Sequence, residues 1–152
     1  MTTDGDELLA ERLKEHGLRV TPQRLAIYRA LVATAEHPTA QMLYERLQPA
    51  LPSLSQATVY NSLQALVACG LVHELGDAGD GALHYDADLS PHLNLVCTCC
   101  HRIEDFFDPS LALVDSAVNS TSGYRIMGAR LVYYGLCAAC QAAPAGAAST
   151  AP

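Results

Sequence analysis

The chain has 152 residues, enough for one large domain or for two small domains with modest cores. Its formal net charge is −7, which on its own argues against a nucleic-acid ligand. It has no apolar run long enough to span a bilayer and no cleavable N-terminal signal, so we expect a cytoplasmic protein with no membrane contact.

The charge is unevenly distributed along the chain. Residues 12–73 hold six basic side chains against three acidic ones, whereas residues 74–152 hold three basic against nine acidic. The first region is therefore suited to phosphates and the second to cations.

The first two predicted helices have clear start or stop signals. An amphipathic helix over 7–16 ends at Gly17, and Thr21 is an N-cap followed by Pro22 at the first position of the next helix. The second helix then carries apolar side chains at helical spacing, namely Leu25, Tyr28, Leu31 and Val32.

Two further helices and a hairpin complete this region. Thr39 can cap a helix that stops before Pro49, and Ser55 can cap another that stops at Gly70. A strand over 71–75, a glycine-rich turn over 76–81 and a return strand over 82–86 follow. Helices followed by a hairpin predict a winged helix-turn-helix.

The rest of the chain is predicted to be rich in strands. The predicted elements are a hinge over 87–91, strands over 93–97, 102–107 and 124–136, and a helix over 109–121 with Leu111, Val114 and Val118 facing inward. Residues 141–152 are small or polar and are predicted to be disordered. The fold class is therefore α+β.

Two cysteine pairs carry the strongest chemical signal. Cys97 and Cys100 form one C-x-x-C pair, and Cys137 and Cys140 form another. Each pair can place two thiolates at about 2.3 Å from one metal ion, and two pairs complete a tetrahedron. We expect a structural Zn²⁺ site, which is closed and leaves no coordination position for chemistry.

Other interpretations of the six cysteines stay open. The pairs could be surface dithiols or the redox pair of a thiol enzyme, but a reactive thiolate is favoured at a helix N-terminus. Both pairs are predicted to follow strands and to end in loops, and no βαβ pattern surrounds them. Cys69 and Cys99 are interpreted as residues that do not bind metal.

Four segments precede the cysteine pairs in the chain: Gly17–Arg24, His37–Ala40, Ala57–Leu63 and Gly70–Val72. Together with the cysteine pairs, and in this order, they resemble the ferric uptake regulator (Fur) family of metal-dependent repressors. The resemblance covers about residues 8–140. It implies a winged-helix DNA-binding domain over 1–86, a hinge over 87–91 and a dimerisation and metal-binding domain over 92–140.

The resemblance assigns DNA contacts to the predicted helix that begins at Ser55. The first residues of such a helix face base edges in the major groove. Arg19 is expected to enter the minor groove or to contact phosphate, and Tyr60 to lie near thymine methyl groups. The candidates on the helix are Ser55, Gln56, Thr58, Tyr60 and Asn61.

The resemblance also implies a regulatory metal site that joins both domains. Its ligands match His37, Asp86, His92 and Asp105. The family usually has a histidine where this chain has Asn94, so an amide oxygen could ligate, His84 could take its place, or the coordination number could drop. A cation held in this way would select the DNA-competent state.

One further metal site departs from the family pattern, one histidine matches none of it, and one aspartate is similar to a single branch of the family. A further metal site of many members is expected to be absent, because the chain has Pro91, Met127 and Gly128 at those places. His101 matches no ligand position and is interpreted as a surface residue. Aspartate at 105 is similar to the peroxide-sensing and manganese-responsive branch.

The sequence therefore predicts a homodimeric repressor, activated by Mn²⁺ or Fe²⁺, of metal-uptake or oxidative-stress genes. Its partner is expected to be a double-stranded operator with an inverted repeat, and we expect no catalysis. The alternatives are a zinc-responsive uptake repressor of the same family and, from another class, a C-x-x-C thiol redox protein. With Asn94 replacing a histidine, we expect weak peroxide sensitivity and a lean toward Mn²⁺.

Overall fold

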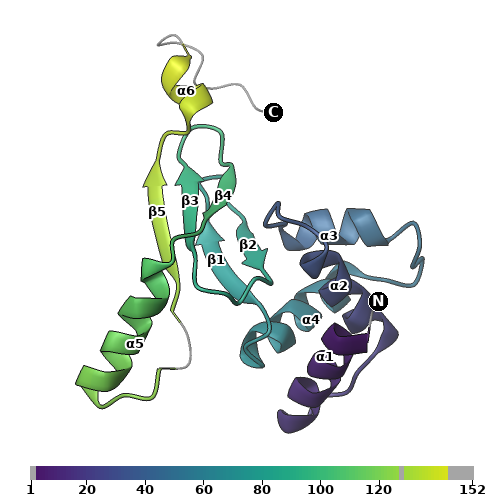
Figure 1. Ribbon diagram of the computed structural model, residues 1–152. Helices are drawn as coiled ribbons and strands as arrows, with labels where there is room; N and C mark the ends of the chain where they lie inside the picture. Colours follow the sequence, from purple (N-terminus) through teal and green to yellow (C-terminus); the bar gives the residue numbers. More distant parts are fainter. Residues whose placement is uncertain (1–2, 127–128, 144–152) are drawn as a thin grey trace. The chain divides into compact units, whose positions relative to one another are not determined.

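A computed structural model describes residues 3–126 and 129–143 (Figure 1). The fold is α+β, as predicted. The chain divides into two compact units, the first formed by residues up to Gly76 with 82–89, and the second by 77–81 with the chain from Ser90 onward. Met127, Gly128 and residues 144–152 lie outside the described residues. Of the predicted tail over 141–152, residues 141 and 142 lie in the helix Ala138–Ala142.

Four helices build most of the first unit (Figure 1). The predicted caps are confirmed: the side chains of Thr21, Thr39 and Ser55 each accept a hydrogen bond from the backbone N–H three residues later. These bonds satisfy donors that a helix start would otherwise leave unpaired. The helices are α1 (Thr3–Glu15), α2 (Pro22–Val32), α3 (Ala40–Leu47) and α4 (Gln56–Ala68).

One buried apolar cluster fills the first unit. Leu13 of α1, Ile27 of α2, Leu43 of α3 and Leu63 of α4 are each completely removed from solvent. Burying a leucine side chain contributes roughly 1.5–3 kcal/mol, so this cluster is the main stabilising feature of the unit. It fixes α4 against α2 and α3.

A two-stranded hairpin follows the helices. It pairs β1 (His73–Asp77) with β2 (Leu83–Asp86). The first strand begins two residues later than predicted, because Leu71 and Val72 are buried in the helical core instead. β2 also approaches the segment before α3, where the backbone N–H of Tyr85 donates to the carbonyl of Pro38 at 3.1 Å.

The tip of the hairpin belongs to the second unit. Asp77 Oδ1 accepts hydrogen bonds from the N–H groups of Gly79 and Gly81 at 2.7 and 2.9 Å, which closes the turn. The carbonyl of Ala78 lies 3.0 Å from His101 Nδ1, and a Cβ on Gly79 would lie 2.9 Å from the same nitrogen. The interpretation of His101 as a surface residue is therefore wrong, since its half-buried ring packs on this turn.

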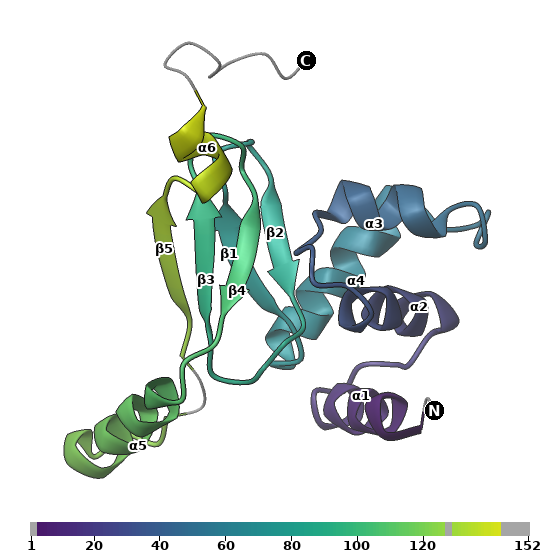
Figure 2. The same ribbon diagram turned by 45° about the horizontal axis from the view of Figure 1, so that its top comes forward.

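The second unit is built on a three-stranded sheet of order β4-β3-β5 (Figure 2). The central strand β3 is antiparallel to β4 and parallel to β5, and Asn94 on β3 faces Asp105 on β4 in the register. The elements are β3 (Leu93–Cys97), β4 (Ile103–Phe106), α5 (Ser110–Ser122), β5 (Leu131–Gly135) and α6 (Ala138–Ala142).

The long strand predicted over 124–136 is wrong in its first half. Among the described residues of this segment, only Leu131–Gly135 form a strand. Gly123 ends α5 in the left-handed conformation, and the N–H of Ile126 donates to Asn119 Oδ1 at 2.9 Å. These contacts tie the following segment to the helix and keep it out of the sheet.

The apolar stripe on α5 faces solvent in the single chain. Val114 is 56% exposed and Val118 is 41% exposed, so the expectation that they point inward is wrong for one chain. Helical spacing identifies an apolar stripe but does not say what covers it. No helix in the described part of the chain has both the length and the apolar character needed to cross a membrane.

Candidate metal centres and nucleic-acid interface

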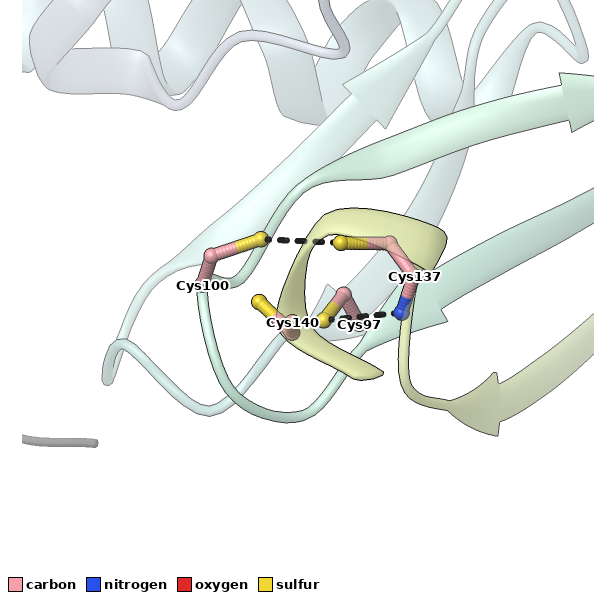
Figure 3. A group of neighbouring side chains, drawn as sticks. All are labelled: Cys97, Cys100, Cys137 and Cys140. Carbon is pink, nitrogen blue, oxygen red and sulfur yellow. Dashed lines mark hydrogen bonds between the residues drawn. The ribbon is translucent and has the colours of Figure 1, made fainter. Parts of the chain in front are cut away.

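The structure brings the two cysteine pairs together at one end of the sheet. Cys97 ends β3 and Cys100 lies in the turn after it, whereas Cys137 and Cys140 lie at the start of α6 (Figure 3). All four sulfur atoms lie within 4.8 Å of one another. The expectation that the second pair ends in a loop is wrong, because Cys137 is the N-cap of the short helix α6.

The spacing of the sulfurs fits a tetrahedral ion. Cys100 Sγ and Cys137 Sγ are 3.8 Å apart. Four sulfurs at about 2.3 Å from a central Zn²⁺ lie about 3.8 Å from one another, so this pair already has the required separation. The cluster therefore fits a closed four-thiolate site.

Backbone groups prepare one of these thiols for ionisation. The N–H groups of Cys100, Cys137 and Cys99 lower the pKa of Cys97 to about 6, and the N–H of Cys137 lies 3.3 Å from its sulfur. Side-chain hydrogen bonds that the thiol of Cys140 donates to Cys137 and Cys99 raise the pKa of Cys140 instead. Crowded sulfurs cannot all ionise without a cation, so metal binding releases protons here.

The first unit supplies two of the predicted regulatory ligands. His37 Nε2 and Asp86 Oδ2 lie 3.9 Å apart, and both side chains are buried. His37 adopts a positive φ of 52° just before Pro38, where the chain meets β2. His84, the alternative ligand, has Nδ1 at 2.7 Å from the carbonyl of His37, so that ring nitrogen is already engaged.

The second unit supplies the other three. His92 Nε2 lies 3.5 Å from Asp105 Oδ1 and accepts a hydrogen bond from Asn94 Nδ2 at 3.2 Å. The Nδ1–H of His92 donates to the carbonyl of Ser90 at 2.8 Å, which makes Nε2 the acceptor nitrogen of the ring.

Asn94 has an unusual environment in this group. It is 2% exposed, and within the described residues its side-chain oxygen has no hydrogen-bond partner. A buried amide oxygen without a partner costs roughly 1–3 kcal/mol. An ion that this oxygen could approach would remove that cost.

The predicted DNA-contacting residues fall into two groups on α4. The hydroxyl groups of Ser55 and Thr58 are engaged in the cap, 2.8 Å from each other. Tyr60 and Asn61 are exposed and reach solvent from the next turn. Gln56 is exposed at the first position of the helix and bonds to Gln41 of α3, a residue that the sequence reasoning missed.

The basic side chains of the first unit are partly neutralised. Arg19 is exposed and stays a candidate for phosphate contact. The guanidinium of Arg29 pairs with Asp6, and that of Arg46 lies 2.7 Å from Glu36. The excess of positive charge inferred from the sequence is therefore smaller at the surface than a count of residues indicates.

A helix-turn-helix with a hairpin, joined in one chain to a four-thiol cluster, defines the class of metal-binding regulators of transcription. Comparison with known proteins makes the assignment specific. Residues 15–134 match the model of the ferric uptake regulator family. The chain belongs to this family, as its motifs predicted, and it is a metal-responsive DNA-binding transcriptional repressor.

Individual relatives agree with this assignment. The peroxide operon regulator of Bacillus subtilis strain 168 is 41% identical over 130 residues, which is 86% of this chain and 89% of that protein. The structure resembles the peroxide stress regulator of Campylobacter jejuni, with 33% identity, a TM-score of 0.68, and 85% and 96% of the two chains covered. It also resembles PerR of Streptococcus pyogenes, with 37% identity, a TM-score of 0.52, and coverage of 91% and 94%.

Proposed function

We propose that this chain is a homodimeric repressor of oxidative-stress genes that binds an inverted-repeat operator when a regulatory Mn²⁺ or Fe²⁺ ion is bound. The first unit would read DNA through α4, and the second would hold a structural Zn²⁺ and the second copy. Relatives named for their peroxide response support the link to oxidative stress. Such a repressor acts on DNA in the cytoplasm and carries out no catalysis.

The observation that carries the proposal is the buried oxygen of Asn94. It lies next to His92 and opposite Asp105, two residues whose side chains are suitable metal ligands. Rotation of the amide would exchange the Nδ2–H that now faces His92 Nε2 for the oxygen. The family resemblance adds His37 and Asp86 as further ligands, so the proposed donor set contains both nitrogen and oxygen atoms.

This donor set favours Mn²⁺ or Fe²⁺ over a thiolate-seeking metal, since carboxylate and amide oxygens suit hard cations. Zn²⁺ competes because raw affinity for mixed sites rises toward it, which is the basis of the alternative zinc-responsive repressor. Iron, when bound, would supply reactivity toward peroxide close to His37 and His92. The amide of Asn94 is a weaker donor than the histidine usual in the family, so peroxide sensitivity should be low.

A metal titration of DNA binding tests the proposal. The full-length protein, with its zinc retained, is mixed with fluorescent operator DNA selected from a random pool, and anisotropy is followed with Mn²⁺, Fe²⁺ or Zn²⁺. We expect Mn²⁺ and Fe²⁺ to increase affinity, Asn94→Ala to shift the metal midpoint, and the control Gln64→Ala, at an exposed position outside the predicted DNA contacts, to keep it. Equal DNA binding with and without added metal would contradict the regulatory site.

Mass spectrometry tests the expected low sensitivity to peroxide. Iron-loaded protein treated with mild peroxide should show little oxygen addition at His37 or His92. Rapid and stoichiometric oxidation of either imidazole would instead assign the chain to strong peroxide sensors.

Footprinting of the selected DNA should show two half-sites related by two-fold symmetry, about one helical turn apart or a multiple of it.

A further inference from the structure

A chain of three polar side chains joins α3 to the start of α4. Gln41 Nε2 donates to Glu45 Oε1 at 2.6 Å, one turn along α3. Gln56 Nε2 donates in turn to Gln41 Oε1 at 2.9 Å. All three side chains are exposed, so this array lies on the surface that presents the first turn of α4.

The carboxylate at one end sets the direction of the whole array. A carboxylate only accepts hydrogen bonds, so the amide of Gln41 must turn its nitrogen toward Glu45 and its oxygen toward Gln56. That oxygen requires a donor, which fixes the amide of Gln56 in one of its two orientations. The reverse arrangement would place an amide oxygen against the carboxylate.

The fixed amide leaves a defined pair of groups for a ligand. One N–H of Gln56 is used by Gln41, so the second N–H and the side-chain oxygen stay available, and that oxygen makes no hydrogen bond within the described structure. A donor and an acceptor on one amide edge match the N7 acceptor and the N6 donor of adenine in the major groove. The neighbouring hydroxyls of Ser55 and Thr58 are engaged in the cap and do not compete.

We propose that Gln56 reads an adenine in each operator half-site and that Gln41 and Glu45 are the positioning residues that hold its amide in the adenine-reading orientation. The inference rests on the proposed function, in which α4 enters the major groove. It adds to that function a preference for adenine and names the side chains that cause the preference. Because Gln41 and Glu45 lie on α3, the helix that precedes α4 contributes to specificity without contacting a base.

The test is a selection of bound sequences from a random DNA pool by the metal-loaded, full-length protein. Wild-type protein should enrich adenine at one position of each half-site by about tenfold over other bases, as one bidentate contact allows. Gln56→Ala should remove this preference. Gln41→Met, which has a similar shape but no hydrogen-bonding group, should lower it severalfold.

Three comparisons separate orientation from other effects. Gln64→Met makes the same change at an exposed position of α4 outside the array and should select the wild-type sequences. Gln41→Met should keep the wild-type salt dependence, since it removes no phosphate contact. Glu45→Gln should lower the adenine preference but raise affinity for every sequence, because it removes an acidic group near phosphates.

The outcomes are distinguishable. If Gln41→Met selects the same bases as wild type, or if Gln56→Ala leaves the selected motif unchanged, the inference is wrong while the proposed function stands. If wild-type protein selects no sequence in the presence of metal, the proposed function fails first and this inference fails with it. Adding Gln41→Met to Gln56→Ala should have no further effect on base preference.

Discussion

The two units of this protein are stabilised in different ways. Within the described residues, the large cluster of buried apolar side chains lies wholly in the first unit. Its first and last members along the sequence are Leu9 and Tyr85. Among the described residues of the second unit, few apolar side chains are buried, such as Val96 and Ile103, whereas the aromatic side chains on β5 are exposed. The first unit therefore closes its own core, whereas the second leaves much apolar surface exposed in the single chain. We expect a metal ion at the four-sulfur cluster to stabilise the second unit and a second copy to cover its apolar surface.

Removal of one sulfur should have the largest effect and should act on one unit only. Cys137→Ser is expected to abolish zinc binding and unfold the second unit, since metal binding supplies much of its folding free energy. Zinc content by mass spectrometry and segment-resolved hydrogen exchange would show this, with the α1–α4 helices still protected. Cys99→Ser, outside the four-sulfur cluster, is the control. A Cys137→Ser protein that keeps zinc and full protection would overturn the comparison.

A cavity in the first unit should cost less but still a large part of its stability. Leu63→Ala removes a fully buried side chain and should lower the free energy of unfolding by about 2–5 kcal/mol. Val32→Ala, at a position 59% exposed, should change it by less than about 0.5 kcal/mol. Urea denaturation measures both. Equal costs would mean that the apolar cluster is not what stabilises this unit.

A charge on the exposed stripe of α5 should affect assembly rather than folding of the first unit. Val118→Glu is expected to weaken the dimer by at least about tenfold, because an interface would bury the carboxylate without a partner. Val32→Glu places the same charge on an exposed apolar site of α2 and should leave the dimer intact. Sedimentation velocity across a concentration series reads out both. An unchanged dimer in Val118→Glu would place the interface elsewhere.

The smallest expected effect concerns acid stability. The side-chain hydrogen bond from Arg29 lowers the pKa of Asp6 in the first unit, and hydrogen bonds from Ser110 lower the pKa of Asp108 in the second. A carboxyl with a lowered folded pKa stabilises the fold above its unfolded value near 3.8, and this contribution is lost as the pH falls through the folded pKa.

Asp6→Asn and Asp108→Asn should therefore each flatten the loss of stability with acid below about pH 4. Hydrogen exchange resolved by segment should show the effect of each variant in its own unit. If both variants keep the wild-type acid profile, these pairs contribute nothing measurable, as is common for exposed charges.

Sequence reasoning succeeded where the determining contacts are local. The caps at Thr21, Thr39 and Ser55 join residues three apart, so a short motif specifies them. The four cysteines were also found by spacing, because each pair lies on one turn. By contrast, His37 and Asp86 are brought close by the approach of β2 to the segment before α3, and only the family resemblance indicated that pairing.

Contacts between distant residues account for what was missed. The hydrogen bond between Gln41 and Gln56 joins two helices through exposed side chains, and no periodic pattern in the sequence predicts it. The segment after α5 alternates like a strand, but a single bond to Asn119 draws part of it toward the helix. The stripe on α5 was correctly identified as apolar, but the expectation that it faces the interior of the chain was wrong. Helical spacing carries no information about whether a second chain covers such a stripe.

The turn at the tip of the hairpin has a practical consequence for dividing this protein. Because residues 77–81 belong with His101, the chain passes from one unit to the other at three places: after Gly76, after Gly81 and after Leu89. No single peptide bond separates the two units. A fragment ending at Leu89 would keep the turn but lose the imidazole against Ala78, and the complementary fragment would lack the glycine that fits beneath that ring.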